Sequence, residues 1–360
     1  MNSSAPKRRD SVIAVDLGGR TTKAVYLQKK AEKFVLSSYA VMDAPIYEKN
    51  LSAEMLTEHL KTVVQALDAR TKVATLVAGV NDSILRHTEM PAMPVGDMRQ
   101  VLKMNPKNYL QQDLPGYVFD CLITPPKAAP TPAKADAKAD PKTKTPIGQQ
   151  RHRVLVGGAK RQFIEDIQSA IKGAGLTGDC IIPALLGPVN AFELCYPEAF
   201  AKENVALVDI GFKSSSISIL EQGNLSMSRV VNIGGDRFTR DLADILSISY
   251  AEAEGVKIGM MAEAQPHIEA AVITLGRELR ASIDFFEHQQ DKTVSQVYIS
   301  GGSAASESIV QLLQAELMVE CKTWNPTSFA QAALPPHKTA ELDAVASQLT
   351  VAVGAAIASL

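Results

Sequence analysis

Two stretches of this chain, about half a chain apart, repeat one design. Residues 12–27, VIAVDLGGRTTKAVYL, align without a gap with residues 205–220, VALVDIGFKSSSISIL. The alignment pairs Asp16 with Asp209, Gly18 with Gly211, Arg20 with Lys213, Thr21 with Ser214 and Thr22 with Ser215. Each copy predicts two strands joined by a short turn. A hairpin that recurs in the same register predicts two related α/β halves that face each other.

The rest of the chain alternates between strand and helix patterns. The predicted strands cover residues 12–16, 24–28, 34–41, 73–80, 154–157, 205–210, 216–221, 226–232 and 297–300. The predicted helices cover residues 52–69, 162–173, 183–195, 237–246, 266–289 and 304–317. With 360 residues the chain exceeds the roughly 250–300 at which a single core stops growing, so we expect a bilobed α/β protein.

Composition excludes several classes of protein. The net charge of −2 lacks the basic excess of a general nucleic-acid binder. Cysteines 121, 180, 195 and 321 form no CxxC pair, which favours free thiols over a zinc site or a disulfide framework. The apolar run before Asp16 is too short for a signal peptide. Residues 342–360 are apolar but interrupted by polar side chains, which favours a closing core helix over a spanning helix, with a membrane-lying amphipathic helix as the alternative.

One segment has the composition of a linker. Residues 125–146, PPKAAPTPAKADAKADPKTKTP, contain no hydrophobic residue larger than Ala. Such a segment cannot offset its ordering entropy by burial, so residues 125–150 are predicted to be a disordered, Pro-stiffened insertion.

The repeated hairpin has the groups that hold a phosphate and a magnesium ion. Gly18, Gly19 and Gly211 allow close approach of backbone N–H groups to an anion, and hydroxyl donors follow at Thr21, Thr22, Ser214 and Ser215. Asp16 and Asp209 end their strands where a hydrated Mg²⁺ is held by one or two carboxylates and phosphate oxygens. Lys23 reaches a phosphate from the first hairpin. A single Asp-x-Gly could only make a tight turn, but the matched pair favours binding of the β- and γ-phosphates of ATP.

Two further glycine pairs lie between a strand and a helix. Gly301 and Gly302 follow the predicted strand 297–300, and Gly234 and Gly235 precede the predicted helix 237–246. Backbone at the start of a helix can approach a nucleotide closely. Each pair alone is also typical of a simple strand break.

With these motifs the chain resembles the actin-like ATPases, and among them the PilM family of type IV pilus systems, with the division protein FtsA as a more distant relative. Residues 16–23 resemble the first phosphate motif of that family, residues 209–216 the second, and residues 300–303, with Ser303, the adenosine motif. Residues 91–123 resemble its inserted small domain, and residues 232–259 and 279–289 are similar to later segments. The resemblance implies a bilobed actin-like fold with a duplicated ribonuclease H-like design, and a lysine, here Lys257, directed towards the adenosine.

The resemblance also implies a division into domains. The first lobe is expected at residues 10–80 with 341–360, the inserted domain at 81–180, and the second lobe at 181–340 with a helical subdomain at about 236–290. Asp16 and Asp209 are then the catalytic and metal-facing residues.

Three positions depart from the pattern of the family. Ile182, before Pro183, stands where hydrolysing relatives often have a water-positioning Glu, which leaves Asp179 as the nearest candidate base. Ser308 replaces a glycine of the adenosine motif, and the second turn has bulky Phe212 and Lys213. We therefore expect ATP binding with slow or absent hydrolysis.

Three functions follow from the sequence. The first is a cytoplasmic, ATP-binding scaffold of a pilus-like assembly that docks the N-terminal cytoplasmic tail of a PilN-like inner-membrane protein, with membrane association through that partner and no nucleic acid. The alternatives are a sugar or acetate kinase of the same superfold and an FtsA-like membrane-tethered polymer. Fold alone does not choose among them.

Overall fold

The computed structural model describes residues 9–45, 52–125 and 151–360. Of the predicted linker 125–150, all but Pro125 lies outside these ranges. The chain forms two compact units: the larger joins Met1–Asp82 to Phe163–Leu360, and the smaller is Ser83–Gln162. The inserted domain was predicted at 81–180, and the predicted C-terminal bound at residue 180 is wrong, because the smaller unit ends at Gln162. Helix α4 (Arg161–Gly173) and strand β8 (Thr177–Pro183) belong to the larger unit, because β8 pairs with β4 and α4 packs on the same sheet.

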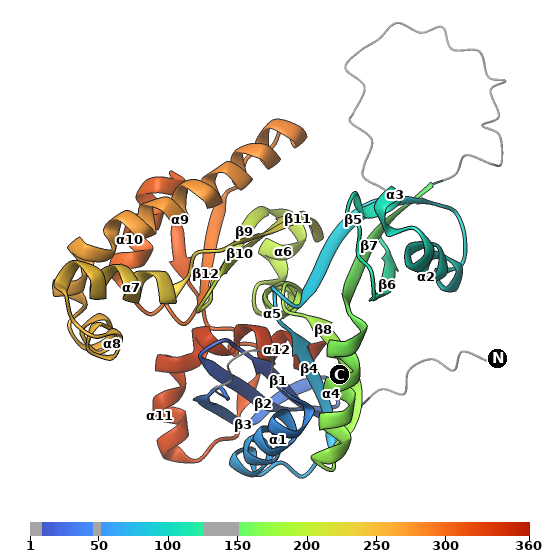
Figure 1. Cartoon of the computed structure of the whole chain (residues 1–360), viewed down its shortest axis with the longest axis horizontal. Helices are drawn as coiled ribbons and strands as arrows, with labels where there is room; N and C mark the ends of the chain where they lie inside the picture. The colour runs from blue at the N-terminus through green and yellow to red at the C-terminus, as the bar shows by residue number, and fades with distance from the viewer. Residues whose placement is uncertain (1–8, 46–51, 126–150) are drawn as a thin grey trace, which may run out of the picture. The chain divides into compact units, whose positions relative to one another are not determined.

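Two sheets build the larger unit, and they share one order of five strands, to which the first sheet adds β14 at its edge (Figure 1). The first has the order β14-β3-β2-β1-β4-β8, and its strands are β1 (Ser11–Leu17), β2 (Thr21–Lys30), β3 (Lys33–Asp43), β4 (Val73–Ala78), β8 and β14 (Gln331–Ala332). The second has the order β11-β10-β9-β12-β13, and its strands are β9 (Asn204–Ile210), β10 (Ser215–Glu221), β11 (Asn224–Val231), β12 (Gln296–Gly301) and β13 (Cys321–Thr323). In the first sheet, β1 is antiparallel to its hairpin partner β2 and parallel to β4. In the second sheet, β9 is antiparallel to β10 and parallel to β12. This confirms the duplicated design, and we call the parts around the two sheets the first and second lobes.

Equivalent residues of the two copies face equivalent sides. Val12 and Val205 begin matched strands, and both lie in a core between the two sheets. Their neighbours Ile13 and Ala206 point the other way, into separate outer cores. Such alternation is the period of a β-strand. Each sheet is therefore buried on both faces, which is why these strands are almost continuously apolar.

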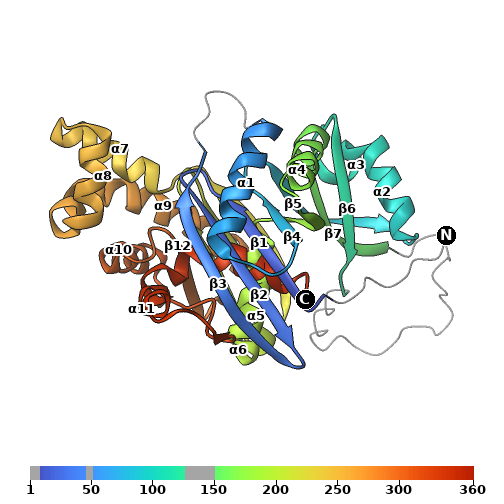
Figure 2. The same ribbon diagram turned by 90° about the horizontal axis from the view of Figure 1, so that it is seen from below.

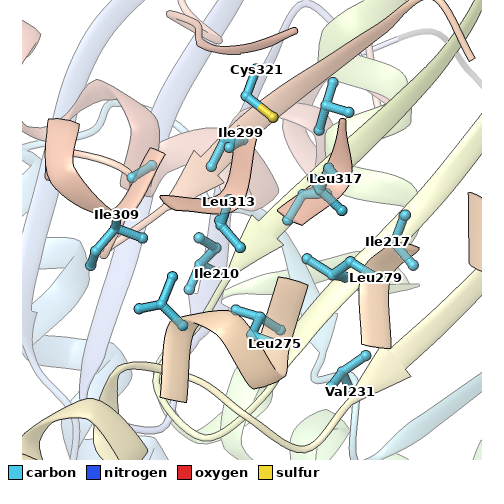
Figure 3. Packing of buried hydrophobic residues seen from close by; sticks show 14 of the residues in the cluster. Ile210, Ile217, Val231, Leu275, Leu279, Ile299, Ile309, Leu313, Leu317 and Cys321 are labelled. Atoms are coloured by element: carbon cyan, nitrogen blue, oxygen red, sulfur yellow. The ribbon is translucent and has the colours of Figure 1, made fainter. Parts of the chain in front are cut away.

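Helices lie between the two sheets and cover the outer face of each (Figures 1 and 2). Between the sheets lie α5 (Leu186–Cys195) and α12 (Thr350–Ile357). The outer face of the first sheet is covered by α1 (Ala53–Leu67), whose N-cap is Ser52, and by α4. The outer face of the second sheet is covered by α9 (Met261–Gln290) and α10 (Glu307–Leu317). Figure 3 shows this last core, where Ile210 and Ile299 of the strands meet Leu275 of α9 and Leu313 of α10.

The two central helices cross at glycines. A Cβ on Gly354 of α12 would overlap the carbonyl oxygen of Gly187 of α5, and a Cβ on Gly187 would lie 2.7 Å from the Val351 Cα. The Asn190 side chain donates a 3.1 Å hydrogen bond to the Gly354 carbonyl. Backbone therefore packs on backbone where the two lobes share a core.

The chain returns to the first lobe earlier than residue 341, the expected start. Strand β14 already pairs with β3, and α11 (Pro336–Val345), the turn η1 (Ala346–Leu349) and α12 follow. Within the described residues, the run Pro336–Ile357 is the one helical stretch long and apolar enough to cross a membrane, and 56% of its most apolar part is buried in the fold. Burial of α12 from Thr350 to Ala356 supports the closing core helix.

Two helices extend from the second lobe. They are α7 (Gly235–Leu246) and α8 (Tyr250–Gly259), at the yellow end of the lobe in Figure 1. Helix α8 begins with a capping box between Ser249 and Glu252. The short α6 (Pro197–Lys202) follows α5. Helix α5 begins at Leu186 and not at Pro183, because Pro183 still pairs with Ala78 as the last residue of β8.

The smaller unit is an antiparallel sheet with helices on one face. Its order is β5-β7-β6, with β5 (Ser83–Pro91), β6 (Tyr117–Ile123) and β7 (Arg151–Lys160). Helices α2 (Val95–Met104) and α3 (Pro106–Leu110) bury Met98, Leu102 and Leu110 against Val154 and Val156 of β7. This unit has a hydrophobic core of its own.

Candidate functional site

The two aspartates of the repeat lie at the ends of β1 and β9. Asp16 is directly opposite Lys23 in the β1–β2 pair, and the Lys23 ammonium lies 3.8 Å from its carboxylate. Burial, which leaves 9% of Asp16 exposed, raises the pKa of its carboxyl group, and the charge of Lys23 opposes that shift. The first hairpin therefore holds a buried carboxylate with one cation beside it.

Asp209 has a different neighbour. Ser300 of β12 pairs with it in register, and the Ser300 hydroxyl donates a 3.0 Å hydrogen bond to its carboxylate. Burial raises the pKa of Asp209 to about 6; the negative charge of Asp16 adds to the shift, while Ser300 and Lys23 oppose it. The negative charges of Asp16 and Asp209 repel each other, and a divalent cation held by these carboxylates would supply the missing positive charge.

A cavity of about 610 Å³ opens beside the two hairpin turns. Seven of the predicted site residues line it: Thr21, Lys23, Gly211, Gly235, Lys257, Gly302 and Ser303. Further lining comes from residues that the sequence had not placed in a site: Arg20, Glu254, Ile258, Ala305, Ser306, Glu307, Ile309 and Gln348. Ser308 and Phe212, noted as departures from the family pattern, also line it. Helices α8 and α10 give the cavity both apolar side chains, Ile258 and Ile309, and charged ones, and the first hairpin adds Arg20 and Lys23.

Other predicted residues form the walls behind this lining. A Cβ on Gly234 would lie 2.5 Å from the Phe212 carbonyl oxygen, so only glycine allows this approach of α7 to the second turn. Gly301 has φ +96° against the Ile210 carbonyl, a conformation that also favours glycine. Gly18 and Gly19 lie in the first turn, beside Lys23 and Phe212 respectively.

The hydroxyl groups of Thr22 and Ser215 are not phosphate donors in this structure. Thr22 is fully buried, and its hydroxyl lies 2.8 Å from a ring nitrogen of His59 on α1. The Ser215 hydroxyl donates to the Ile233 carbonyl at 2.7 Å. Ser214 is also buried, and its carbonyl accepts from the Gly211 N–H. Thr21 is thus the one of the four predicted hydroxyl residues that lines the cavity.

Lys257 lies in a polar network on α7 and α8. Its ammonium donates to the Glu254 carboxylate at 2.7 Å, to the Thr239 hydroxyl at 2.6 Å and to the Gly235 carbonyl at 3.2 Å. Thr239 also donates a short hydrogen bond to Glu254. Although burial acts in the opposite direction, the bonds from Lys257 and Thr239 and the nearby positive charges lower the pKa of Glu254. The network fixes a carboxylate and an ammonium on the wall of the cavity.

The donor set fits a magnesium ion held mainly by phosphate and water. Among the described residues no group of three or more His, Cys, Asp or Glu side chains could hold a metal on its own. Asp16 and Asp209 nevertheless offer the one or two carboxylates that Mg²⁺ takes at phosphate sites.

A protein-family model described as "Type IV pilus assembly protein PilM" matches residues 142–360, which is more than half of the chain. The chain belongs to the PilM family. A solved PilM–PilN type IV pilus biogenesis complex is similar over 98% of this chain and 99% of that one, with 20% identity and a TM-score of 0.81. MreB5 of Spiroplasma citri bound to AMPPNP covers 97% of this chain and 95% of its own, with 10% identity and a TM-score of 0.50. These likenesses confirm the bilobed actin-like fold.

A curated relative matches over a shorter stretch. Cell division protein FtsA of Bacillus subtilis is 30% identical over 122 residues, which are 34% of this chain and 27% of FtsA. The chain thus spans about a quarter of the length of that relative. In this PilM family member, the predicted base Asp179 lies 3.2 Å from Arg9 and is not among the residues that line the cavity. Ile182 is buried in the core between the sheets.

Proposed function

We propose that this PilM family member binds ATP with Mg²⁺ in the cavity beside the β1–β2 and β9–β10 turns. The observation that carries the proposal is that the two copies of one hairpin place Asp16 and Asp209 next to the lining residues Lys23 and Gly211, close enough for the charge of Asp16 to act on Asp209. Carboxylates that lack sufficient counter-charge, next to Lys23 and small turn residues, suit a metal–triphosphate. The AMPPNP bound to MreB5 supports this use of the fold.

Each part of the cavity has a role in this proposal. Asp16 and Asp209 would hold the hydrated metal, which would supply positive charge to the phosphates. Lys23 and the backbone of the turns contact the phosphates, with Thr21 as a hydroxyl donor. Gly302, Ser303 and Lys257 lie on the adenosine side, where Ile258 and Ile309 give an apolar surface for the base.

We expect slow or absent hydrolysis and an assembly in place of a metabolite, because neither of the two positions considered for a water-positioning base, Asp179 and Ile182, lines the cavity. Ile182 is apolar and buried, and Asp179 is paired with Arg9. We propose a cytoplasmic scaffold of a type IV pilus-like machine that docks the cytoplasmic tail of a PilN-like inner-membrane protein. The solved PilM–PilN complex supports this partner. The two alternatives, a kinase and a membrane-tethered polymer, have no such support.

The test is a binding experiment on the intact chain. MgATP at a hundredfold excess over its dissociation constant should stabilise the protein by about 2.7 kcal/mol, and a peptide of the partner's cytoplasmic tail should bind in the same sample. Asp16→Ala and Asp209→Ala should remove the MgATP effect and leave the fold intact by circular dichroism. An unchanged melting shift in both variants would refute the nucleotide site, and sugar-dependent release of ADP at enzyme-like rates would instead support a kinase.

A further inference from the structure

Arg20 connects the two lobes across the cavity. It follows Gly19 in the first turn, yet both of its side-chain contacts belong to the second lobe. The guanidinium lies 3.5 Å from the Glu254 carboxylate and 5.8 Å from the centre of the Phe212 ring. Its backbone is fixed, because the Arg20 carbonyl accepts a 2.9 Å hydrogen bond from the Ala44 N–H. The side chain can therefore change partner while its attachment point stays in place.

The ion pair between Arg20 and Glu254 is weak, so its loss costs little free energy. An ion pair at 3.5 Å, with 40% of the Arg20 side chain exposed, is of the class worth about 0–1 kcal/mol. Glu254 would not be left unpaired, because Lys257 at 2.7 Å and Thr239 both still donate to it. The charge of Lys257 is already balanced by this carboxylate, whereas that of Arg20 is available to a stronger anion.

A terminal phosphate is such an anion. A guanidinium forms paired, charge-assisted hydrogen bonds to phosphate that are stronger than a single long contact to a carboxylate. A nucleotide with its base near Ile258 and Ile309 and its metal near Asp16 and Asp209 would direct its last phosphate towards the turn that carries Arg20. On the basis of the proposed nucleotide site, we propose that Arg20 distinguishes a nucleoside triphosphate from a diphosphate by exchanging Glu254 for the γ-phosphate.

The Phe212 ring supports the Arg20 side chain in this arrangement. A large residue in the second turn is unexpected beside a phosphate, but its ring lies under the guanidinium of Arg20 and packs 3.4 Å from the position of a Cβ on Gly19. A cation over an aromatic face is held without using its N–H donors. Phe212 therefore keeps Arg20 over the cavity with its hydrogen-bonding groups available.

The repeat offers a matched control. Lys213 aligns with Arg20 and is also basic, but it is exposed and does not line the cavity. We would measure the dissociation constants of AMPPNP and ADP, each with Mg²⁺, by titration calorimetry for the wild type, Arg20→Ala, Arg20→Lys and Lys213→Ala. Arg20→Ala should weaken AMPPNP about tenfold and ADP less than twofold, with Arg20→Lys in between and Lys213→Ala unchanged for both.

The outcomes separate this inference from the proposed function. An equal loss for both nucleotides in Arg20→Ala, or an equal change of selectivity in Lys213→Ala, would overturn the role of Arg20 while the site itself stands. A wild type that binds neither nucleotide would overturn both proposals. If Arg20→Ala is too unstable to measure, Arg20→Lys and Phe212→Ala replace it in the test. Both variants should lower the preference for AMPPNP over ADP. An unchanged preference in both would reject the inference.

Discussion

Ser300 donates a 3.0 Å hydrogen bond to Asp209, whereas the residue in the same place beside Asp16 is Val77. The two copies therefore agree in strand order but not in the neighbours of their carboxylates. A cation compensates Asp16, and only a hydroxyl and the more distant Lys23 compensate Asp209. Because of this asymmetry, we expect Asp209 to be the more sensitive of the two carboxylates to pH.

Ser300→Ala should lower the free energy of unfolding by about 1.5–3 kcal/mol at pH 8, the range for a hydrogen bond to a charged group. Urea unfolding would measure it. In an Asp209→Asn background the same change should cost only about 1 kcal/mol, because the acceptor is then neutral. Equal costs in the two backgrounds would mean that the two side chains are not coupled in solution.

Asp209→Asn should stabilise the protein in the absence of nucleotide while abolishing its response to MgATP. Burial raises the pKa of Asp209 to about 6, so between about pH 4 and pH 6 the folded state binds more protons than the unfolded state and stability falls as pH rises. The variant avoids that loss and should gain about 1–2 kcal/mol at pH 8, allowing for the partial exposure of Asp209. Its advantage should vanish below pH 4. Glu198→Gln, on a carboxylate 88% exposed, is the control and should show no gain.

His59 should make stability depend on pH in the opposite direction. Burial lowers the pKa of this half-buried imidazole, whose ring nitrogen lies 2.8 Å from the Thr22 hydroxyl. Well above pH 6.5 the ring is neutral in both states and contributes no slope. As pH falls below 6.5 the unfolded state takes up a proton first, so stability declines by at most about 1.4 kcal/mol per pH unit. The difference between wild type and His59→Gln in unfolding experiments from pH 8 to 5 isolates this slope, and parallel profiles would contradict it.

Gly354→Ala should be among the most damaging single changes in the chain. Its methyl group would overlap the Gly187 carbonyl at the helix crossing, so the core between the sheets must open, and we expect a loss above about 3 kcal/mol. Gly255→Ala is the matched control, since that exposed helical glycine has nothing within 4 Å of a Cβ and should gain up to about 1 kcal/mol. Thermal melts would compare the two, and similar melting temperatures would show that the helices are not in contact.

The sequence predicted the central strands well because a strand buried on both faces is read from its apolar run alone. The gapless alignment of the two repeats also showed which residues are equivalent, so the correspondence of Asp16 and Asp209 could be predicted from the sequence. The start of the helix after Pro183 and the end of the inserted domain were harder to predict. Whether α4 and β8 belong to the insert or to the first sheet depends on the pairing of β8 with β4, which no local pattern encodes.

The error at Thr22 was avoidable. Consecutive residues of a strand point to opposite faces, so Thr21 and Thr22 cannot both reach one phosphate, and only Thr21 lines the cavity. Glu254 was missed because its importance depends on α8, which was not predicted. The Ser249-x-x-Glu252 capping box was the available sign of that helix, and Glu254 and Lys257 then fall three residues apart on one face.

The core between the sheets also determines which parts of the molecule unfold together. Val12 and Val205 contribute to the same cluster as α5 and α12, so neither lobe has a complete interior without the other. Unfolding of either lobe exposes part of that shared interior, and the two lobes should therefore unfold as one cooperative unit. Residues 83–162 have a separate core and can open on their own. Hydrogen exchange on the intact chain should give the amides of β1 and β9 one common opening free energy, with those of β7 exchanging through a lower one.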